Sequence, residues 1–79
     1  MYYNIGNLYA AKGDIDKAIE CYKISIALEP LYHLSRINLG NMYMEKGMYK
    51  EALQEYENAL KIAPDEVMPY NNMAIIYLE

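Results

Sequence analysis

The sequence predicts an all-α protein, a solenoid of antiparallel helix–turn–helix repeats with about five helices. Three observations support this prediction. First, the chain shifted by 34 residues matches itself at 12 of 45 overlapping positions, and such a period is typical of stacked helical repeats. Second, apolar residues recur three and four positions apart, which is the spacing of one helix face. Third, glycines or prolines interrupt these stretches at regular intervals, as helix ends require.

The first repeat is predicted over residues 1–30 and is expected to be truncated at its N-terminus. Its first helix carries an apolar stripe, which consists of Tyr2, Ile5, Leu8 and Tyr9. The pair Gly13–Asp14 breaks this helix. A second apolar stripe predicts the second helix and consists of Ile15, Ala18, Ile19, Tyr22 and Ile26. Pro30 ends that helix, because the residue before a proline is disfavoured in the helical conformation.

The second repeat is predicted over residues 31–64, and the first helix of a third repeat over residues 65–79. Helices of the second repeat are expected over about 31–46 and 49–62, separated by Gly47 and ended by Pro64. The last helix is predicted to begin near Asp65, a suitable N-cap residue. Pro69 would then lie in or near its first turn, where a missing N–H costs little. Residues 1–79 are therefore interpreted as a single segment of one solenoid.

The charge balance argues against nucleic-acid and membrane binding. The 79 residues include seven Lys and Arg against eleven Asp and Glu, for a net charge of −4. Nucleic-acid binders instead carry clustered basic patches, and anionic membranes attract polybasic segments. No apolar run approaches the roughly 20 residues that span a bilayer. The single cysteine, Cys21, cannot form an internal disulfide and is typical of a reducing compartment, so a cytoplasmic location is expected.

No set of residues predicts catalysis, a cofactor or a metal site. His33, the only histidine, is expected at an exposed helix start, far from any residue that could complete a metal site with it. The sequence has no glycine-rich phosphate loop and no nucleophile motif. Asp14 and Asp16 lack the rest of a calcium loop and are interpreted as caps of the second helix. The chain is therefore predicted not to be an enzyme.

Small residues are predicted where helices approach closely. Gly6 and Gly40 are expected to bring the two helices of a hairpin together, and Ala74 takes their place in the third repeat. Ala18 and Ala52 are expected to act in the same way from the second helix. The spaces between hairpins are expected to be filled by tyrosines, namely Tyr9, Tyr22, Tyr43 and Tyr56.

These residues resemble the tetratricopeptide repeat, a 34-residue helix–turn–helix unit. The stretches NIGNLY (4–9) and NLGNMY (38–43) match its first helix, and Gly13 and Gly47 match its turn. Its second helix is matched by Ala18, Tyr22, Pro30, Ala52, Tyr56, Ala59 and Pro64. The chain departs from the pattern at Arg36, where a large aromatic is usual, at Ser25, where Ala is usual, and at Ala74, where Gly is usual.

The resemblance implies a right-handed superhelix whose first helices line a concave groove, and this groove usually binds an extended or helical peptide of a partner protein. The residues expected to line it are Tyr3, Asn4, Asn7, Leu34, Ile37, Asn38, Asn41, Met44, Met68, Asn72 and Ile75, with Leu78 beside them. The asparagines recur in two parallel rows, one of Asn4, Asn38 and Asn72 and a shorter one of Asn7 and Asn41. Their amides can donate and accept hydrogen bonds at once. They either hold the backbone of a peptide or tie neighbouring helices together. The apolar members either contact a ligand or pack against neighbouring repeats.

One type of ligand is disfavoured by the groove residues. Some members of the family bind an acidic C-terminal peptide through a clamp of two Asn, two Lys and one Arg. The Asn positions of this clamp match Asn7 and Asn38, but its basic positions fall on Tyr3, Met68 and Asn72. Strong carboxylate binding needs charge-assisted donors. The expected ligand is therefore a protein or peptide other than an acidic C-terminal tail.

The ends of the chain carry apolar residues where solenoids usually have polar caps. The last helix is expected to present Met73, Ile76 and Tyr77 to a partner, which predicts either a longer array or association of copies through their terminal helices. Three functions follow from the sequence. The first is a protein-binding adaptor, the second a self-assembling scaffold that forms homo-oligomers, and the third a substrate-recruiting segment of a larger enzyme.

Overall fold

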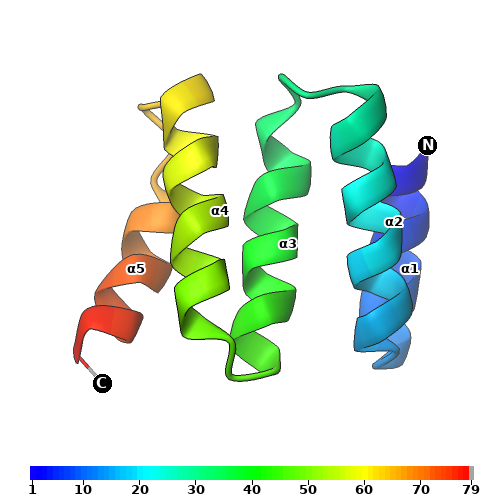
Figure 1. The fold of residues 1–79 in the computed structure, drawn as a ribbon, viewed down its shortest axis with the longest axis horizontal. Helices are drawn as coiled ribbons and strands as arrows, with labels where there is room; N and C mark the ends of the chain where they lie inside the picture. Colours follow the sequence, from blue (N-terminus) through cyan, green and yellow to red (C-terminus); the bar gives the residue numbers. More distant parts are fainter. Residues whose placement is uncertain (79) are drawn as a thin grey trace.

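The computed structural model describes residues 1–78, which form five α-helices joined by short turns. The helices are α1 (Tyr2–Lys12), α2 (Ile15–Leu28), α3 (His33–Glu45), α4 (Tyr49–Ile62) and α5 (Met68–Leu78). Sequential helices run antiparallel and stand side by side in chain order (Figure 1). The described residues contain no β-strand. The prediction of an all-α fold with about five helices is confirmed.

Two glycines close the hairpins in the same way. Gly13 and Gly47 adopt the left-handed conformation, with φ of 84° and 75°, which is favourable mainly for glycine. Their backbone N–H groups donate to carbonyl oxygens of the preceding helices, those of Ala10 and Met44. After the first of these turns, the side chain of Asp14 caps α2 by accepting a hydrogen bond from the backbone N–H of Lys17 at 3.4 Å.

The predicted start of the last helix is wrong. Asp65 lies in a turn, and α5 begins only at Met68. A helix starting at Asp65 would place Pro69 beyond its first turn, where the proline ring clashes with a carbonyl and a hydrogen bond is lost. Beginning at Met68 keeps Pro69 in the first turn, as expected. The first helix of the second repeat is also shorter than predicted, since α3 spans His33–Glu45.

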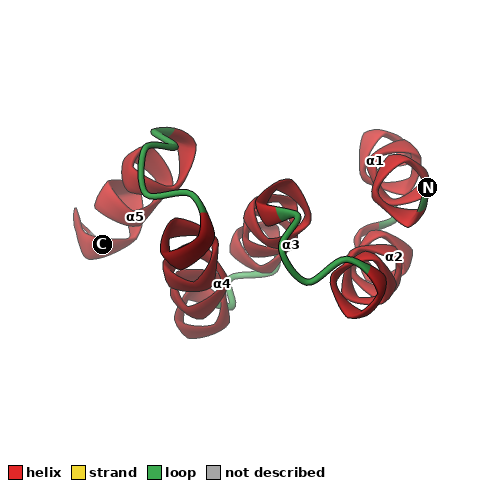
Figure 2. Ribbon diagram, turned by 90° about the horizontal axis from the view of Figure 1, so that it is seen from above, coloured by secondary structure: helices red, strands yellow, loops and turns green. Residues whose placement is uncertain are grey.

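The helices form two layers. Viewed from above, α1 and α5 flank α3 on one side of the row, and α2 and α4 lie on the other side (Figure 2). The first helices of the repeats therefore share one face of the molecule, and the second helices share the opposite one. We call the surface formed by α1, α3 and α5 the first-helix face.

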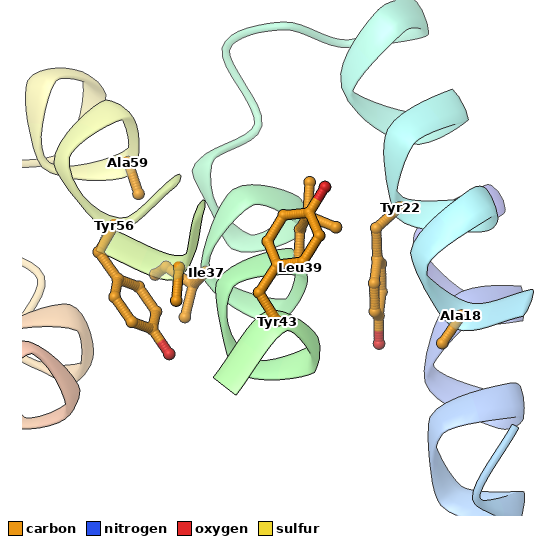
Figure 3. Close-up of a cluster of buried hydrophobic side chains, with 8 residues drawn as sticks. Ala18, Tyr22, Ile37, Leu39, Tyr43, Tyr56 and Ala59 are labelled. Atoms are coloured by element: carbon orange, nitrogen blue, oxygen red, sulfur yellow. The ribbon is translucent and has the colours of Figure 1, made fainter. Parts of the chain in front are cut away.

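The buried core lies between the layers and connects the first hairpin to the second. It consists of Ala18, Tyr22, Ile37, Leu39, Tyr43, Ala52, Tyr56 and Ala59. Figure 3 shows Tyr22 and Tyr56 on either side of α3. A buried pair of hydroxyls also joins the hairpins, since the Oγ atoms of Ser25 and Ser35 are 2.6 Å apart. This contact gives Ser25 a role at a position where alanine is usual.

Arg36, which departs from the usual pattern in the second repeat, pairs with a carboxylate. Its Nη1 lies 3.6 Å from Oε1 of Glu55, and both side chains are about four-fifths buried. Burial raises the pKa of Glu55, and the positive charge of Arg36 partly opposes this shift. The ion pair joins α3 to α4 at the position where a large aromatic would otherwise pack.

Within each hairpin, a tyrosine ring lies directly over a glycine. A Cβ atom added to Gly6 would lie 2.6 Å from Cε1 of Tyr22, and one added to Gly40 would lie 2.7 Å from Cε1 of Tyr56. The predicted close approach at these two glycines is therefore confirmed. Ala74 differs from them, because it is exposed and no described helix packs over it.

Replacing Gly40 by Ala is expected to lower the free energy of unfolding by up to about 2 kcal/mol. Overpacking typically costs about 1–3 kcal/mol, and the better helix propensity of alanine returns about 1 kcal/mol. Urea denaturation followed by circular dichroism measures the change. The control is the same substitution combined with Tyr56→Leu, which removes the ring and with it the penalty. An equal loss in both backgrounds would show that the ring is not the cause.

Candidate peptide-binding face

The first-helix face is almost free of charge. Among the residues of its three helices, only Lys12, Arg36 and Glu45 carry a formal charge, and Arg36 is paired with Glu55. The second helices are different, since α4 alone contains Lys50, Glu51, Glu55, Glu57 and Lys61. The first-helix face therefore offers amide and apolar groups to a ligand and few charges.

Asparagine side chains connect neighbouring first helices. Nδ2 of Asn38 donates to Oδ1 of Asn7 at 2.8 Å, which links α3 to α1. Nδ2 of Asn72 donates to Oδ1 of Asn41, also at 2.8 Å, which links α5 to α3. Each link joins residues 31 positions apart, so an asparagine of one predicted row bonds to an asparagine of the other.

The same oxygen atoms also accept hydrogen bonds from the core tyrosines. The hydroxyl of Tyr22 donates to Oδ1 of Asn7 at 2.5 Å, and the hydroxyl of Tyr56 donates to Oδ1 of Asn41 at 2.5 Å. Burial raises the pKa of Tyr22 and raises that of Tyr56 to about 12. Asn7 and Asn41 thus satisfy buried hydroxyl groups and tie three helices together.

These contacts separate the asparagines into two kinds. Asn7 and Asn41 accept two hydrogen bonds each and act in the framework of the fold. Asn38 and Asn72 are half-buried and use one N–H of their amides in these links, while Asn4 is exposed. The Asn7 and Asn41 oxygens therefore support the interpretation of helix ties, while Asn4 is free to reach a ligand.

The apolar members of the predicted groove differ in exposure. Ile37 has no exposed surface and belongs to the core, so its prediction as a groove-lining residue must be corrected. Ile37 is covered because α3 packs between α2 and α4. Leu34 and Met44 are half-buried and pack against the core. Met68 and Ile75 are 44% and 50% exposed.

Tyr3 contributes to the face mainly through contacts with other rings. Its ring is half-buried, lies 5.1 Å from that of Tyr32 in an edge-on arrangement, and lies 6.2 Å from that of Tyr22. Such distances are favourable for aromatic pairs. Leu8, which is 64% exposed on α1, was not among the predicted groove residues because it belongs to the apolar stripe that predicted the helix.

The exposed side of α5 is not the one predicted from the sequence. Met73 and Ile76 are half-buried and pack against the core, so their prediction as partner-facing residues is wrong. The packing of α5 on α4 and α3 covers them. The large apolar residues of α5 that remain exposed are Met68, Tyr70, Ile75, Tyr77 and Leu78. Of the three predicted residues, only Tyr77 is available to a partner.

The remaining reactive side chains have structural surroundings. His33 is half-buried at the start of α3, and its Nε2 lies 3.3 Å from Oε2 of Glu66, so the prediction of an exposed position is corrected. Cys21 is buried, and burial, followed by the charge of Glu20, raises the pKa of its thiol. Across residues 1–78, no three metal-ligating side chains gather at one place, and no helix has the length and apolar character needed to cross a bilayer.

Layered helical hairpins that repeat along one axis, with a shared face of first helices, define the class of helical-repeat interaction proteins. The sequence comparisons identify the family. A family model described as "Tetratricopeptide repeat" matches residues 1–32, and one described as "TPR repeat" matches residues 40–79. The chain therefore belongs to the tetratricopeptide-repeat family, whose members generally act as non-catalytic modules of protein–protein interaction.

A solved structure agrees with this assignment. The chain is similar to one described as "Crystal structure of MamA", with a TM-score of 0.94 and 26% sequence identity over 96% of this chain. The chain covers 44% of the length of that solved chain. No curated protein matches the sequence. The expected solenoid of antiparallel helical repeats is confirmed by this similarity and by the two family matches.

Replacing Asn41 by Ala is expected to lower the free energy of unfolding by about 1–3 kcal/mol. The change removes the oxygen acceptor of the buried Tyr56 hydroxyl and leaves it only the weakly accepting sulfur of Met44 at 3.2 Å, and a poorly satisfied buried donor costs about this much. Asn4→Ala is the matched control, because Asn4 is exposed and surface changes stay within about 0.5 kcal/mol. Similar losses in the two variants, measured by urea denaturation, would contradict the framework role of Asn41.

Alkaline conditions are expected to destabilise the protein through Tyr56. Burial raises the pKa of Tyr56 from the ordinary value of 10.0 to about 12. The folded state therefore keeps the hydroxyl proton up to a higher pH than the unfolded chain does. Between these values the unfolded chain has released the proton and the folded chain has not, so the unfolding free energy falls as pH rises. In Tyr56→Phe this contribution is absent, and the fall should be less steep. A pH series of denaturant unfolding measures both slopes, and identical slopes would contradict the prediction.

Proposed function

We propose that this chain is a peptide-binding adaptor segment that performs no catalysis and binds a neutral, largely apolar peptide or amphipathic helix on its first-helix face. The observation that carries the proposal is the near absence of charge on α1, α3 and α5. A charged ligand would lose hydration on this surface without gaining a partner of opposite charge. Apolar side chains and backbone amides of a ligand lose little favourable hydration free energy on this surface.

The exposed groups of this face suit such a ligand. Asn4 on α1 offers an amide that can both donate and accept, and it lies near one end of the row of helices. Met68 and Ile75 on α5 offer flexible apolar surface near the other end. A ligand crossing from α1 to α5 would therefore meet polar contacts on one side and apolar contacts on the other. Acidic C-terminal tails are not expected to bind.

The proposal predicts that Met68→Glu lowers the affinity for such a ligand at least about tenfold, because a charge would be desolvated against apolar groups. The ligand is first selected from a random peptide library displayed on phage, and the selected peptides should be neutral and apolar. Ile24→Glu is the matched control. Ile24 is 41% exposed on α2, so it tests the same change on the opposite layer. Isothermal titration calorimetry measures both affinities.

Two results would overturn the proposal. One is selection of peptides that are mainly acidic or basic. The other is an equal loss of affinity in Met68→Glu and Ile24→Glu, which would place the ligand away from the first-helix face.

A scaffold function remains a second candidate because α5 exposes several large apolar residues, including Tyr70 and Tyr77. Burying such side chains against another copy would be favourable by about 1.5–3 kcal/mol each. Light scattering of the same variants separates the two functions. A mass that rises with concentration, without any selected peptide ligand, favours the scaffold.

In a substrate-recruiting segment of a larger enzyme, the same first-helix face would bind the substrate.

A further inference from the structure

The two edges of the row of helices differ in charge. The turns within the hairpins lie along one edge, which we call the hairpin-turn edge, and the connections α2–α3 and α4–α5 lie along the other (Figure 1). We call this second edge, formed by residues 28–33 and 63–67, the inter-hairpin edge. Four of the seven basic residues of the chain lie at the hairpin-turn edge, in residues 12–17 and 46–50, whereas the inter-hairpin edge contains no lysine or arginine.

The inter-hairpin edge exposes a group of large apolar side chains. Leu28, Leu31 and Val67 have exposed fractions of 66%, 78% and 64%, and Tyr32 beside Leu31 in the chain is also exposed. At the hairpin-turn edge, Tyr49 is the one large apolar residue that is exposed. Single exposed apolar residues are ordinary on a protein surface, but a group of them gathered in one place marks an interaction site.

Backbone hydrogen bonds hold both connections of this edge in the same shape. The N–H of Tyr32 donates to the carbonyl oxygen of Glu29, and the N–H of Glu66 donates to that of Ala63, both at 3.1 Å. These two turns lie 34 residues apart and are therefore equivalent in the repeat. The two connections are also joined to each other, because Nε2 of His33 lies 3.3 Å from Oε2 of Glu66.

Side chains of the following helices bind the same two connections. Nη2 of Arg36 donates to the carbonyl oxygen of Pro30 at 3.4 Å, and the hydroxyl of Tyr70 donates to that of Pro64 at 3.3 Å. The two donors differ in type, yet they occupy equivalent positions and bond to equivalent carbonyls. A surface whose backbone is fixed in this way loses little conformational entropy when a ligand binds.

The charges of the inter-hairpin edge are mainly negative. Its carboxylates belong to Glu29, Asp65 and Glu66. Glu66 is paired with His33, whereas Glu29 and Asp65 are exposed. Lys61 lies outside the edge, in the last turn of α4. Exposed apolar side chains flanked by carboxylates are complementary to a ligand that carries aliphatic and basic residues together.

We propose that the inter-hairpin edge binds a segment of a partner protein that combines aliphatic residues with lysine or arginine. This site and its ligand differ from the neutral peptide proposed for the first-helix face. Two copies of the chain joined through this edge would bring their Glu29 and Asp65 carboxylates together, and like charges oppose association. The hairpin-turn edge of a second copy offers lysines but little apolar surface. Anionic membranes attract basic surfaces rather than acidic ones.

Two designed helical peptides test the proposal. Both carry leucine at every third or fourth position, and the flanking positions are lysine in one peptide and glutamate in the other. Fluorescence anisotropy of the labelled peptides measures their affinities for the wild-type chain and for its variants. The amide NMR signals of residues 28–33 and 63–67 show whether a peptide binds at the inter-hairpin edge.

The wild-type chain is expected to bind the lysine peptide about fivefold or more tightly than the glutamate peptide. Glu29→Lys/Asp65→Lys is expected to remove or reverse this preference. The matched control is Glu45→Lys/Glu51→Lys, which changes the net charge equally at exposed positions of the opposite edge and should keep the preference. Leu31→Ser is expected to weaken binding of the lysine peptide about threefold or more, because apolar contact is lost.

Three results would overturn the proposal. The first is equal affinity of the two peptides for the wild-type chain, and the second is an equal loss of preference in the two charge variants, which would reflect net charge alone. The third is a set of NMR shifts confined to residues outside the inter-hairpin edge. A mass that rises with concentration in light scattering and no longer rises in Leu31→Ser would also overturn it, since the edge would then bind a second copy.

Discussion

The contact of a tyrosine ring with a glycine, one in each complete hairpin, determines how the helices of this protein are placed. Tyr22 lies over Gly6 and Tyr56 over Gly40, so close that a Cβ atom added to either glycine would overlap with the ring. This proximity brings each hydroxyl to an asparagine on the first helix. The asparagine in turn bonds to the next first helix, 31 residues further on. One buried ring therefore fixes both the distance within a hairpin and the stagger between hairpins.

Much of the fold could be predicted from residues whose effect is local. The left-handed glycines at 13 and 47 and the prolines at 30 and 64 mark helix ends through backbone geometry alone, and the predicted bounds of α4 agree with the structure. The prediction that the last helix begins near Asp65 was wrong because two preferences compete there. The N-cap preference of Asp65 is worth about 1 kcal/mol, whereas a proline in a helix interior costs about 3 kcal/mol. The larger effect decided where α5 begins.

The site was predictable only in part, because it depends on how the hairpins are staggered. Rows of asparagines follow from the period of 34 residues, but the observed links join one row to the other. The burial of Ile37 and of Met73 likewise depends on which neighbour covers each helix side. Periodicity identifies the apolar side of a helix, but it does not distinguish a side covered by the neighbouring hairpin from one open to a ligand.

The contrast between α5 and the other helices has a consequence for how the molecule opens. Pro69 is the only buried residue of α5, whereas α3 contains five. In a linear array, each unit is held only by its neighbours, so a helix with so little buried surface is expected to open before the rest of residues 1–78 unfolds. Its amides are then the least protected from exchange with solvent. A partner that binds α5 in its packed position therefore stabilises the closed state by mass action and makes this local opening less favourable.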